Sequence, residues 1–413
     1  MRTTSPALTR RAFVKGVAAA TIAAPAVLRF GTGSSRAQTF GLVGDGKAND
    51  LPALRQMLAE AERRGKGVIS LPAGRFRLEP EDKKPAVVLP ANVRLQGAGR
   101  DQTTLVMADG AFGHVVSAPY GWAQIADLTI DGNEANRIGV VGHNLRLTGD
   151  QILVERVRAI NAVSYGIAIG QRRYARDVTI RDVEIVNAGA DGIDIKNDLA
   201  RTEKIRIEKV TVRGFGRPVA GLPPHLVGSA QDKRRNKAAV DLRGQCEVHD
   251  LTIIGILPDR DGLRFRNGEK GEGHGPGAHN AVASRIVVEG SSRTAAKAQG
   301  IAVVARHVRI SDIDIRNVAI GITVGASDLN VSGGRIQDSQ TAINAHPLAK
   351  NTPEHLQFRS LGFHDIDRMN FGGSHSAEFI ECTFSLCNGQ IQRALEQDKY
   401  ITLHRCLFDP RCR

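Results

Sequence analysis

Charged side chains recur in short segments of one repeated pattern, Gly-Ile-x-Ile or a close variant, and these residues offer the most chemistry. Two carboxylates held about 5 Å apart can divide the acid and base work of glycoside cleavage. We therefore predict that Asp191, Asp194 and Asp241 are catalytic. Basic and polar side chains of the same region would hold the carboxylates of an acidic sugar chain. The predicted substrate-binding residues are Tyr165, Lys196, Arg243, Asp261, Arg264, Arg266 and His274.

The same residues leave other chemistry open. Cleavage by β-elimination needs a base for the proton beside the uronate carboxyl, and an Arg or Lys would serve while the Asp residues held Ca²⁺. Apart from that calcium, no cofactor is required and no metal site is predicted. Tyr165 is either a proton donor in lyase or epimerase chemistry or a structural residue at a corner. A third alternative is a solvated ladder of charges in which Asp241 pairs with Arg243 and Arg264.

The spacing of the repeated segments predicts the element that positions these residues. Their first residues are separated by 26, 47, 23, 38, 21 and 21 residues, which gives a unit of about 21–26 residues with two long insertions. Short strands with period-two alternation and a fixed repeat, with no helices between them, predict an all-β fold. The expected fold is a right-handed, single-stranded parallel β-helix, a solenoid whose coils stack about 4.8 Å apart. The repeated segments are 165–170, 191–196, 238–243, 261–266, 299–304, 320–325 and 341–346, with further strands at 178–185, 205–212 and 308–315.

Alternation assigns the side chains to faces. Ile193, Ile195, Val240 and Leu242 point inward, so their neighbours point outward, and stacking of coils places those neighbours in columns. Two solvent-facing carboxylates one coil apart should repel each other and raise the pKa of one of them. The two predicted columns are Ala168–Asp194–Asp241–Arg264 and Gly170–Lys196–Arg243–Arg266.

Two insertions leave the solenoid beside this charged patch. The first, at 217–237, contains Pro223-Pro224-His225 and the basic run Lys233-Arg234-Arg235, and the second, at 267–280, contains His274 and His279. Insertions in solenoids often build the binding face, so the second loop would reach over the cleft; the alternative is a surface loop. The spacing of the two histidines does not indicate a metal site.

The start of the predicted solenoid carries a family resemblance. Gly44-Asp45-Gly46 is followed by apolar residues at helical spacing from Leu51, with Asp50 as the expected N-cap, and then by a strand at 67–77. This order resembles the pectate-lyase/polygalacturonase-like (glycosyl hydrolase 28-related) β-helix superfamily, as do the stretches 127–133 and 187–194. The resemblance implies a β-helix with an N-terminal capping helix and an acidic polysaccharide substrate. It leaves the chemistry open, because members include hydrolases, lyases, epimerases and phage-type binding proteins.

The family motifs are incomplete in this chain. Asp191 matches the aspartate of the first polygalacturonase motif, but the adjacent Asp-Asp pair has no match, and Gly273-His274-Gly275 falls in a loop. Arg309-Ile310-Ser311 lacks the lysine of the Arg-Ile-Lys motif, and the Asp-Pro-His-Asp sequence of alginate epimerases is absent. These departures put ordinary polygalacturonase activity in doubt.

The N-terminus is typical of a twin-arginine export signal. Arg10-Arg11 is followed by Phe13 and by an apolar run too short for a membrane span, which needs about 20 residues. We predict a signal peptide at 1–38, a β-helix domain at 39–413, export by the twin-arginine translocase and a periplasmic or secreted protein with no membrane span after signal removal. Residues 1–38 carry six basic side chains, so the net charge of +13 falls to +7 without them. That charge suits an acidic polysaccharide and gives no reason to predict nucleic-acid binding.

Four of the five cysteines lie near the C-terminus without the spacing of a zinc site. Cys382 and Cys406 are 24 residues apart and Cys387 and Cys412 are 25 apart, about one coil, so each pair is a predicted disulfide. The sequence as a whole predicts an exported, polysaccharide-active enzyme, a glycoside hydrolase or lyase acting on a uronate-containing glycan. The alternatives are a uronate C5-epimerase and a non-catalytic glycan-binding or envelope-structural β-helix.

Overall fold

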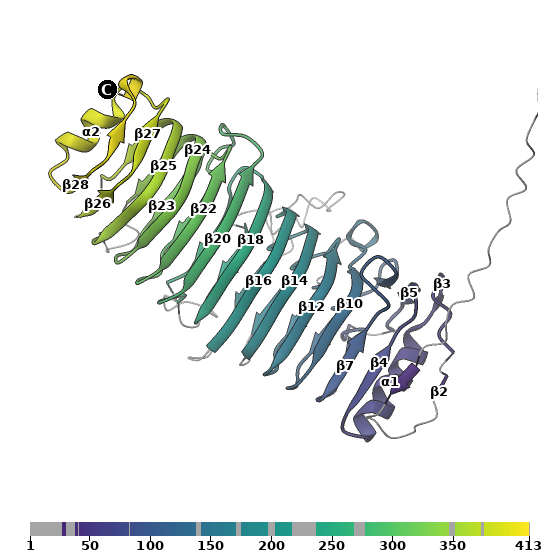
Figure 1. The fold of residues 1–413 in the computed structure, drawn as a ribbon. Helices are drawn as coiled ribbons and strands as arrows, with labels where there is room; N and C mark the ends of the chain where they lie inside the picture. Colours follow the sequence, from purple (N-terminus) through teal and green to yellow (C-terminus); the bar gives the residue numbers. More distant parts are fainter. Residues whose placement is uncertain are drawn as a thin grey trace, which may run out of the picture.

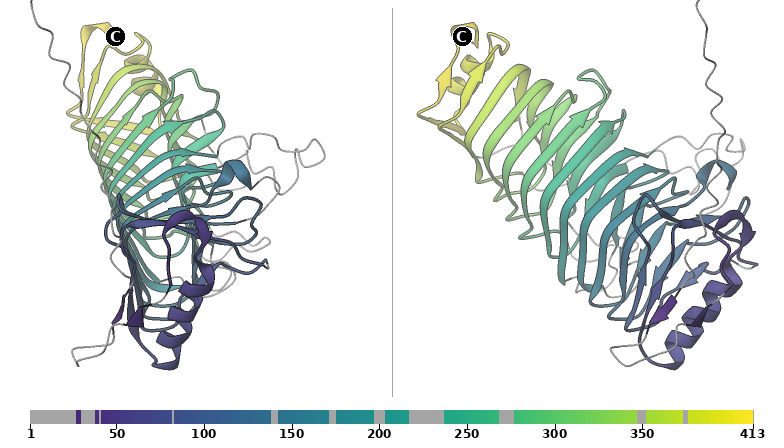
Figure 2. Two further views of the ribbon diagram at one scale, coloured as in Figure 1. Left: turned by 90° about the vertical axis from the view of Figure 1, so that its right-hand side faces the viewer. Right: turned by 45° about the vertical axis from the view of Figure 1, so that its right-hand side comes forward.

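The chain forms a long solenoid of stacked parallel strands (Figure 1), as the repeat predicts. Figure 2 shows from two further sides that the coils follow one axis, with helix α1 (Leu51–Arg63) at the N-terminal end and helix α2 (Ile391–Gln397) near the C-terminal end. This is a right-handed parallel β-helix, and the predicted fold class is confirmed. The computed structural model describes residues 27–29, 38–39, 41–81, 83–137, 142–170, 175–196, 203–216, 237–267, 277–346, 352–372 and 376–412.

Three ladders of strands run along the solenoid. The longest consists of β4 (Gly67–Ser70), β7 (Val93–Gln96), β10 (Gln124–Asp131), β12 (Ile152–Ile160), β14 (Arg176–Ala188), β16 (Glu203–Phe215), β18 (Cys246–Ile256), β20 (Val282–Gly290), β22 (Arg309–Arg316), β24 (Asn330–Ala345), β25 (Leu356–Asn370), β26 (Ala377–Ile380) and β28 (Ile401–His404). The second, which carries the predicted site, consists of β6 (Val87–Val88), β9 (Val116–Ala118), β11 (Leu145–Leu147), β13 (Ile167–Gly170), β15 (Ile193–Lys196), β17 (Lys237–Leu242), β19 (Arg260–Phe265), β21 (Gln299–Val303) and β23 (Ile320–Val324), and the ends of β24 and β25 continue it.

The third ladder consists of separate short strands only in the N- and C-terminal coils. It comprises β3 (Asp45–Asn49), β5 (Gly74–Leu78), β8 (Thr103–Met107), β27 (Thr383–Ser385) and β29 (Leu407–Phe408). In the coils between, the second half of each long strand takes this place, as when β8 pairs with the end of β10. β1 (Val27–Arg29) pairs antiparallel with β2 (Gln38–Thr39) and β4, and short 3-10 helices lie at Glu134–Asn136 and Pro410–Cys412.

Each long strand turns a corner at one residue of left-handed backbone. These residues recur once per coil with φ between 51° and 58°, so the chain bends there without leaving the ladder. Asp is among the residues that tolerate this conformation, and four of the seven are Asp. The column consists of Asp127, Arg156, Asp182, Lys209, Asp250, Arg285 and Asp312.

Most repeated segments have glycine at their second position, because neighbouring coils approach closely there. A Cβ at Gly192 would lie 2.6 Å from the Ala239 carbonyl oxygen and 2.7 Å from Val212 Cγ1, and one at Gly321 would lie 2.6 Å from the Ala342 oxygen. Contacts this short are not tolerated between these atoms, so the second ladder begins where only a small residue fits. Behind it the inward Ile, Val and Leu side chains form one continuous core.

The N-terminal capping helix lies where the sequence predicts it, but one predicted contact, the cap by Asp50, is not formed. Helix α1 lies against β4, β5 and β6, with Leu51, Leu54 and Met57 buried. Asp50 precedes the helix as predicted, but its side chain makes no capping hydrogen bond. Its carboxylate instead accepts the Val43 N–H at 2.6 Å, so it fixes the preceding turn.

The last coils are filled by stacked phenylalanines rather than aliphatic side chains. The ring centroids of Phe363 and Phe384 are 4.9 Å apart, and those of Phe384 and Phe408 are 4.4 Å apart. Aromatic side chains bury large apolar areas, so these stacks form the core of the last coils.

The cysteines lie beside this stack, and the predicted disulfides are not formed. All five thiols are free. Pairing of Ile380 with His404 places Cys382 and Cys406 on successive coils, as expected. However, the Cys382 thiol donates to the Phe358 carbonyl at 3.4 Å and the Cys406 thiol to the Phe379 carbonyl at 3.4 Å. Each thiol therefore contacts the backbone of the preceding coil. The Cys387 N–H lies 3.2 Å from Cys412 Sγ.

No helix in the described part of the chain is long and apolar enough to cross a membrane. The twin-arginine motif, and with it most of the predicted signal peptide, lies outside the described residues.

Candidate functional site

The second ladder brings the predicted site residues into the columns that alternation assigned. Ala168 pairs with Asp194, Asp194 with Asp241, and Asp241 with Arg264 on successive coils, so the predicted register is confirmed. A parallel column three residues earlier contains Asp191 and, two coils later, Asp261, which pairs with Ala238 of the coil between. The insertion between β15 and β17 therefore adds length to one coil without shifting the register.

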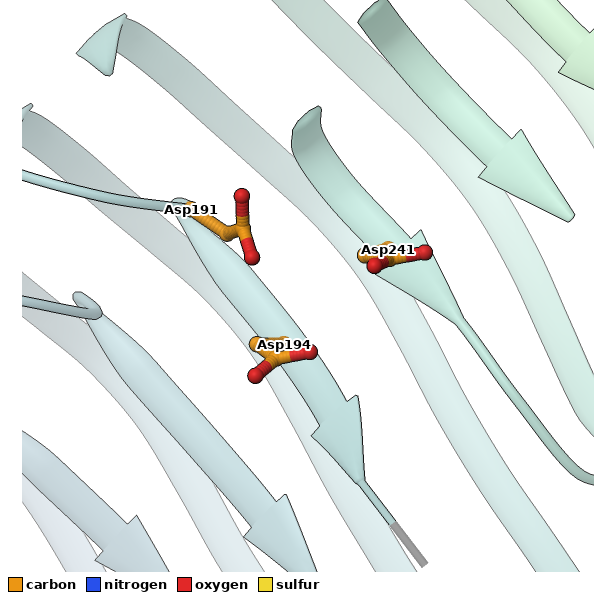
Figure 3. A group of neighbouring side chains, drawn as sticks. All are labelled: Asp191, Asp194 and Asp241. Carbon is orange, nitrogen blue, oxygen red and sulfur yellow. The ribbon is translucent and has the colours of Figure 1, made fainter. Parts of the chain in front are cut away.

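Three carboxylates converge where these columns meet. Figure 3 shows Asp191 at the start of the strand, Asp194 in the middle of β15, and Asp241 on the neighbouring β17. One oxygen from each lies within 4.8 Å of one from each of the others. Asp191 is anchored because its Oδ1 accepts the Ala238 N–H at 2.9 Å.

The prediction that these carboxylates face solvent is wrong. Asp194 is 0% exposed, Asp241 2% and Asp191 4%, although all three point away from the aliphatic core. Long arginine side chains from the following positions lie against them and exclude water, which alternation along a strand cannot reveal. We call the group formed by these residues the charge cluster: Asp191, Asp194, Asp241, Arg243, Asp261, Arg264 and Arg266.

Arg243 and Arg266 bind the central carboxylates directly. Arg243 Nη1 donates to Asp194 Oδ1 at 3.1 Å and to the Ile195 carbonyl at 2.8 Å, and its Nη2 lies 3.5 Å from Asp241 Oδ2. Arg266 donates from Nε to Asp241 Oδ1 at 3.1 Å and from Nη2 to Oδ2 at 3.2 Å. Asp241 is thus held on both oxygens.

The third arginine, Arg264, joins two carboxylates of the cluster. Its Nη2 lies 2.5 Å from Asp261 Oδ2, and its Nη1 lies 3.9 Å from Asp241 Oδ2. A ladder of compensating charges, which the sequence left open as an alternative, therefore exists, but it is buried rather than solvated.

Solvent reaches the cluster at one arginine. The Arg266 side chain is 34% exposed, whereas those of Arg243 and Arg264 are 3% and 8% exposed. Of the described basic groups in the cluster, Arg266 is therefore the one that an anionic ligand can contact without rearrangement.

The pKa of Asp241 reflects both its burial and its arginine neighbours. Burial alone would raise its pKa, but Arg243, Arg264 and Arg266 together outweigh burial and lower it. The sequence predicts that repulsion between the carboxylates raises the pKa of one of them, and at Asp241 three arginines act in the opposite direction. Asp261 behaves differently, because burial raises its pKa in spite of Arg264.

The charge cluster leaves few oxygen atoms free to bind calcium. Ca²⁺ takes about 6–8 oxygen ligands, and the three converging carboxylates would be a natural starting set. Both oxygens of Asp241 are already hydrogen-bonded to Arg266, and Asp194 Oδ1 to Arg243. The guanidinium groups supply the positive charge that a calcium ion would bring.

Chelation should therefore leave the cluster intact. We expect the melting temperature to be the same after dialysis against a chelator and after addition of calcium, because the counter-charges are covalently part of the chain. Differential scanning calorimetry of wild type and Asp194→Asn measures this. A calcium-dependent rise in melting temperature that Asp194→Asn abolishes would show that a metal ion binds here.

An aromatic ladder that the sequence analysis missed leads into the cluster. The rings of His114 and His143 stack at 4.4 Å between centroids, and the ring of Tyr165 lies 4.8 Å from that of His143. The Gly166 N–H donates to the Asp191 carbonyl at 3.1 Å, which places Tyr165 one coil before Asp191 in the same column. The ladder therefore ends beside the carboxylates.

Backbone hydrogen bonds fix the tautomer of the two histidines in their neutral form. The His143 N–H donates to His114 Nδ1 at 3.1 Å, and the Tyr165 N–H lies 3.4 Å from His143 Nδ1. An Nδ1 that accepts leaves the ring proton on Nε2 in the neutral form. Burial, with smaller contributions from Arg146 and Arg137, lowers the pKa of His114 to about 4, so this ring is neutral at neutral pH.

Two predicted binding residues are not placed by the structure. His274, together with Lys233-Arg234-Arg235 and His225 of the first insertion, lies outside the described residues. Lys196 is described in its backbone only, as the last residue of β15. His279 is described; its Nδ1 accepts the Arg306 N–H at 2.9 Å, so it holds the backbone of the next coil.

Comparison with known proteins was made by sequence and by fold. No protein-family model matches the chain. By sequence it is similar to the mannuronan C5-epimerase AlgE3 of Azotobacter vinelandii, with 31% identity over 179 residues, or 40% of this chain and 10% of that protein. It is equally similar to alginate lyase 7 of the same organism, with 31% identity over 178 residues, or 37% of this chain and 20% of the lyase. The chain thus spans a tenth to a fifth of the length of these relatives.

A third relative by sequence is the pre-neck appendage protein of Bacillus phage B103, at 28% identity over 189 residues, or 39% of this chain and 21% of that protein. Among solved structures, the A-module of the A. vinelandii epimerase AlgE4 aligns with a TM-score of 0.52 and 16% identity over 90% of this chain and 96% of that one. The N-terminal fragment of bacteriophage Phi29 gene product 12 aligns with a TM-score of 0.57 and 11% identity over 90% and 70%. What the structures share is the fold. The narrower resemblance to pectate lyases and polygalacturonases stays a prediction.

Proposed function

We propose that this protein is an enzyme that acts on a uronate-containing polysaccharide by proton transfer at the carbon beside the uronate carboxyl. The observation that carries the proposal is that Tyr165 lies one coil before Asp191 of the charge cluster, whose Arg266, two coils beyond Asp191, is partly exposed. A positively charged group that holds the carboxylate stabilises the negative charge that develops when the adjacent proton leaves. A hydroxyl that reaches the same carbon can exchange that proton.

The cluster residues take distinct roles in this proposal. Arg266 holds the uronate carboxylate, and Asp241, bonded to its Nε and Nη2, keeps the guanidinium in place. Tyr165 gives or takes the proton, with its ring supported by His143. Asp194 holds Arg243, so it acts through another residue rather than on the sugar.

Hydrolysis by an Asp194–Asp241 pair fits the geometry less well. A glycosidase needs one carboxyl group that is protonated and reaches the glycosidic oxygen. The arginines lower the pKa of Asp241, and Asp194 Oδ1 is bonded to Arg243. The sequence relatives support the same choice, because mannuronan C5-epimerases and an alginate lyase are among them. Elimination and inversion both begin with loss of that proton, and the residue that completes the reaction decides between them.

Purified protein incubated with mannuronan tests the proposal. Ultraviolet absorbance of unsaturated uronate detects elimination, proton NMR detects inversion, and a reducing-end assay detects total chain cleavage. Unsaturated ends or new guluronate signals support the proposal. Reducing ends without unsaturation would show hydrolysis, and none of the three signals would remove the enzymatic proposal for this substrate.

A second candidate, glycan binding without catalysis, is favoured by one observation. The carboxylates of the cluster are buried and bonded to arginines, as expected of a structural network. The relatives include a phage appendage protein. Binding of mannuronan with no turnover in the three assays would select this function.

We also propose that the protein is exported through the twin-arginine pathway, on the strength of the Arg10-Arg11 motif and the apolar run that follows. Changing Arg10→Lys together with Arg11→Lys should leave precursor in the cytoplasm, because the translocase reads the paired guanidinium groups. Cell fractionation and immunoblotting measure this, with Lys15→Arg as the matched control. Normal export of the double variant would overturn the twin-arginine assignment.

A further inference from the structure

A pocket lined mostly by polar side chains lies on the same face of the solenoid, toward the C-terminus. It has a volume of about 470 Å³ and lies between the corner of β23 and the ends of β24 and β25. The column of Asp241 and Arg264 continues through Ala302 and Thr323 to Asn344. The residues that line the pocket are Ile320, Thr341, Asn344, Arg368, Met369 and Asn370.

The column that contains Asp191 and Asp261 reaches the pocket as well. Asp261 pairs with Gln299, Gln299 with Ile320, Ile320 with Thr341, and Thr341 with Arg368. Asn344 is four coils beyond Asp241, a distance of about 19 Å at about 4.8 Å per coil. A ligand that contacts both Arg266 and the pocket must therefore be a chain of several sugar units running along the solenoid.

The pocket presents a cation that the described residues do not neutralise. Arg368 is exposed, and its Nε donates to Thr341 Oγ1 at 2.9 Å. Among the described residues no acidic partner is seen for it, and no acidic side chain lines the pocket. Arg335, by contrast, is bonded to Asp314 through two nitrogens at 3.0 Å. Arg368 therefore keeps donors for an outside anion.

Amide and hydroxyl groups surround this cation. Asn370 Nδ2 donates to Asn344 Oδ1 at 2.8 Å, which leaves further donor and acceptor sites on both amides. One coil earlier, the outward Thr323 has a buried hydroxyl with no hydrogen-bond partner in the described part of the chain. One guanidinium beside amides and hydroxyls matches a sugar that carries a carboxylate and several hydroxyl groups.

We infer that Arg368, Asn344, Asn370 and Thr341 form a distal subsite that binds a uronate unit of the polysaccharide several units away from the one at Arg266. The inference rests on the proposed function for its ligand class, and it assigns the direction in which the chain lies, from the charge cluster toward β25. Remote binding of this kind holds a polymer in register over the reacting unit.

Calorimetric titration of mannuronan and of its disaccharide into wild type, Arg368→Gln and Arg359→Gln tests the inference. Arg359 is the matched control, since it is an exposed arginine on the same strand that pairs with Ser332 on another side of the coil. Loss of a charge-assisted hydrogen bond should weaken binding of the polymer by about tenfold or more in Arg368→Gln. Binding of the disaccharide, which is too short to span both sites, should not depend on Arg368 if it occupies the site at Arg266.

The outcomes separate the subsite from the proposed reaction. Weaker polymer binding in Arg368→Gln alone, with unchanged melting temperature, supports the subsite whether or not mannuronan is turned over. Equal affinity of Arg368→Gln, Arg359→Gln and wild type would overturn the subsite and leave the proposed function standing. If wild type does not bind mannuronan at all, both the subsite for uronate and the proposed function fail.

Discussion

Asp241→Asn should lower the free energy of unfolding by about 3–5 kcal/mol, because removing one partner of a buried ion pair leaves uncompensated charge. Asp241 contacts Arg243, Arg264 and Arg266, and its side chain is buried. Asparagine keeps the shape but not the charge, so three guanidinium groups lose a common partner. Urea denaturation of both proteins at neutral pH measures the difference.

The matched control is Asp250→Asn. Asp250 binds Arg285 through two hydrogen bonds, at 2.5 and 2.9 Å, but on the surface of the solenoid. Exposed pairs contribute about 0–1 kcal/mol, so the same substitution should have little effect there. Combining Asp241→Asn with Arg266→Gln should recover part of the lost stability, because it removes one unpaired cation. A loss at Asp241 no larger than at Asp250 would mean that the cluster is solvated.

The stabilisation by Asp241 should depend on pH in a defined direction. Its pKa in the folded protein is lowered from the ordinary value of about 3.9. The contribution of Asp241 to stability is therefore complete at pH values above its ordinary pKa. It is lost as the pH falls through the lowered pKa of the folded protein. The difference in stability between wild type and Asp241→Asn should accordingly shrink on acidification.

The order of the site residues along the solenoid could be predicted from the sequence because two independent signals agree. Inward Ile193, Ile195, Val240 and Leu242 fix the face of each strand, and the small residue before them fixes where the strand starts. A shift by one residue would turn every apolar side chain outward. The pairing of Asp194 with Asp241 therefore follows across an insertion of variable length.

Burial of the charge cluster could not be predicted in the same way. Alternation says that Asp194 and Asp241 point away from the core, but it does not say what covers them. Arg243 and Arg266 extend from positions two residues further along their coils and bond back to carboxylates of their own or the preceding coil. Such contacts depend on side-chain conformation and on charge, which a period-two pattern does not encode.

The aromatic ladder was missed although its signal is in the sequence. His114-Val-Val-Ser-Ala and His143-Asn-Leu-Arg-Leu precede Tyr165 by 51 and 22 residues, close to two coils and one. Both segments lack the glycine of the repeated pattern, so a search for Gly-Ile-x-Ile passes over them. A search for alternating apolar residues at the coil spacing would have found Leu145 and Leu147 beneath the ladder.

Tyr165→Phe should reduce turnover of mannuronan by about 10²–10⁴-fold, the usual contribution of a positioned acid or base. The substitution removes the hydroxyl and keeps the ring that packs on His143 at 4.8 Å. Folding stability should therefore change by no more than about 1.5 kcal/mol, the ordinary contribution of one hydrogen bond. Turnover is measured by absorbance of unsaturated ends or by NMR, and stability by urea denaturation.

Tyr120→Phe is the control for this result, because it deletes the same atom from an exposed tyrosine on a corner away from the cluster. If Tyr165 transfers the proton, its phenylalanine variant should still bind mannuronan with the affinity of wild type, since Arg266 and Arg368 remain. Reduced turnover with unchanged affinity would place the hydroxyl in the chemical step. Full activity in Tyr165→Phe would mean that the ladder is only a support for the coil, and Arg266 would then be the described cluster residue left to act on the substrate.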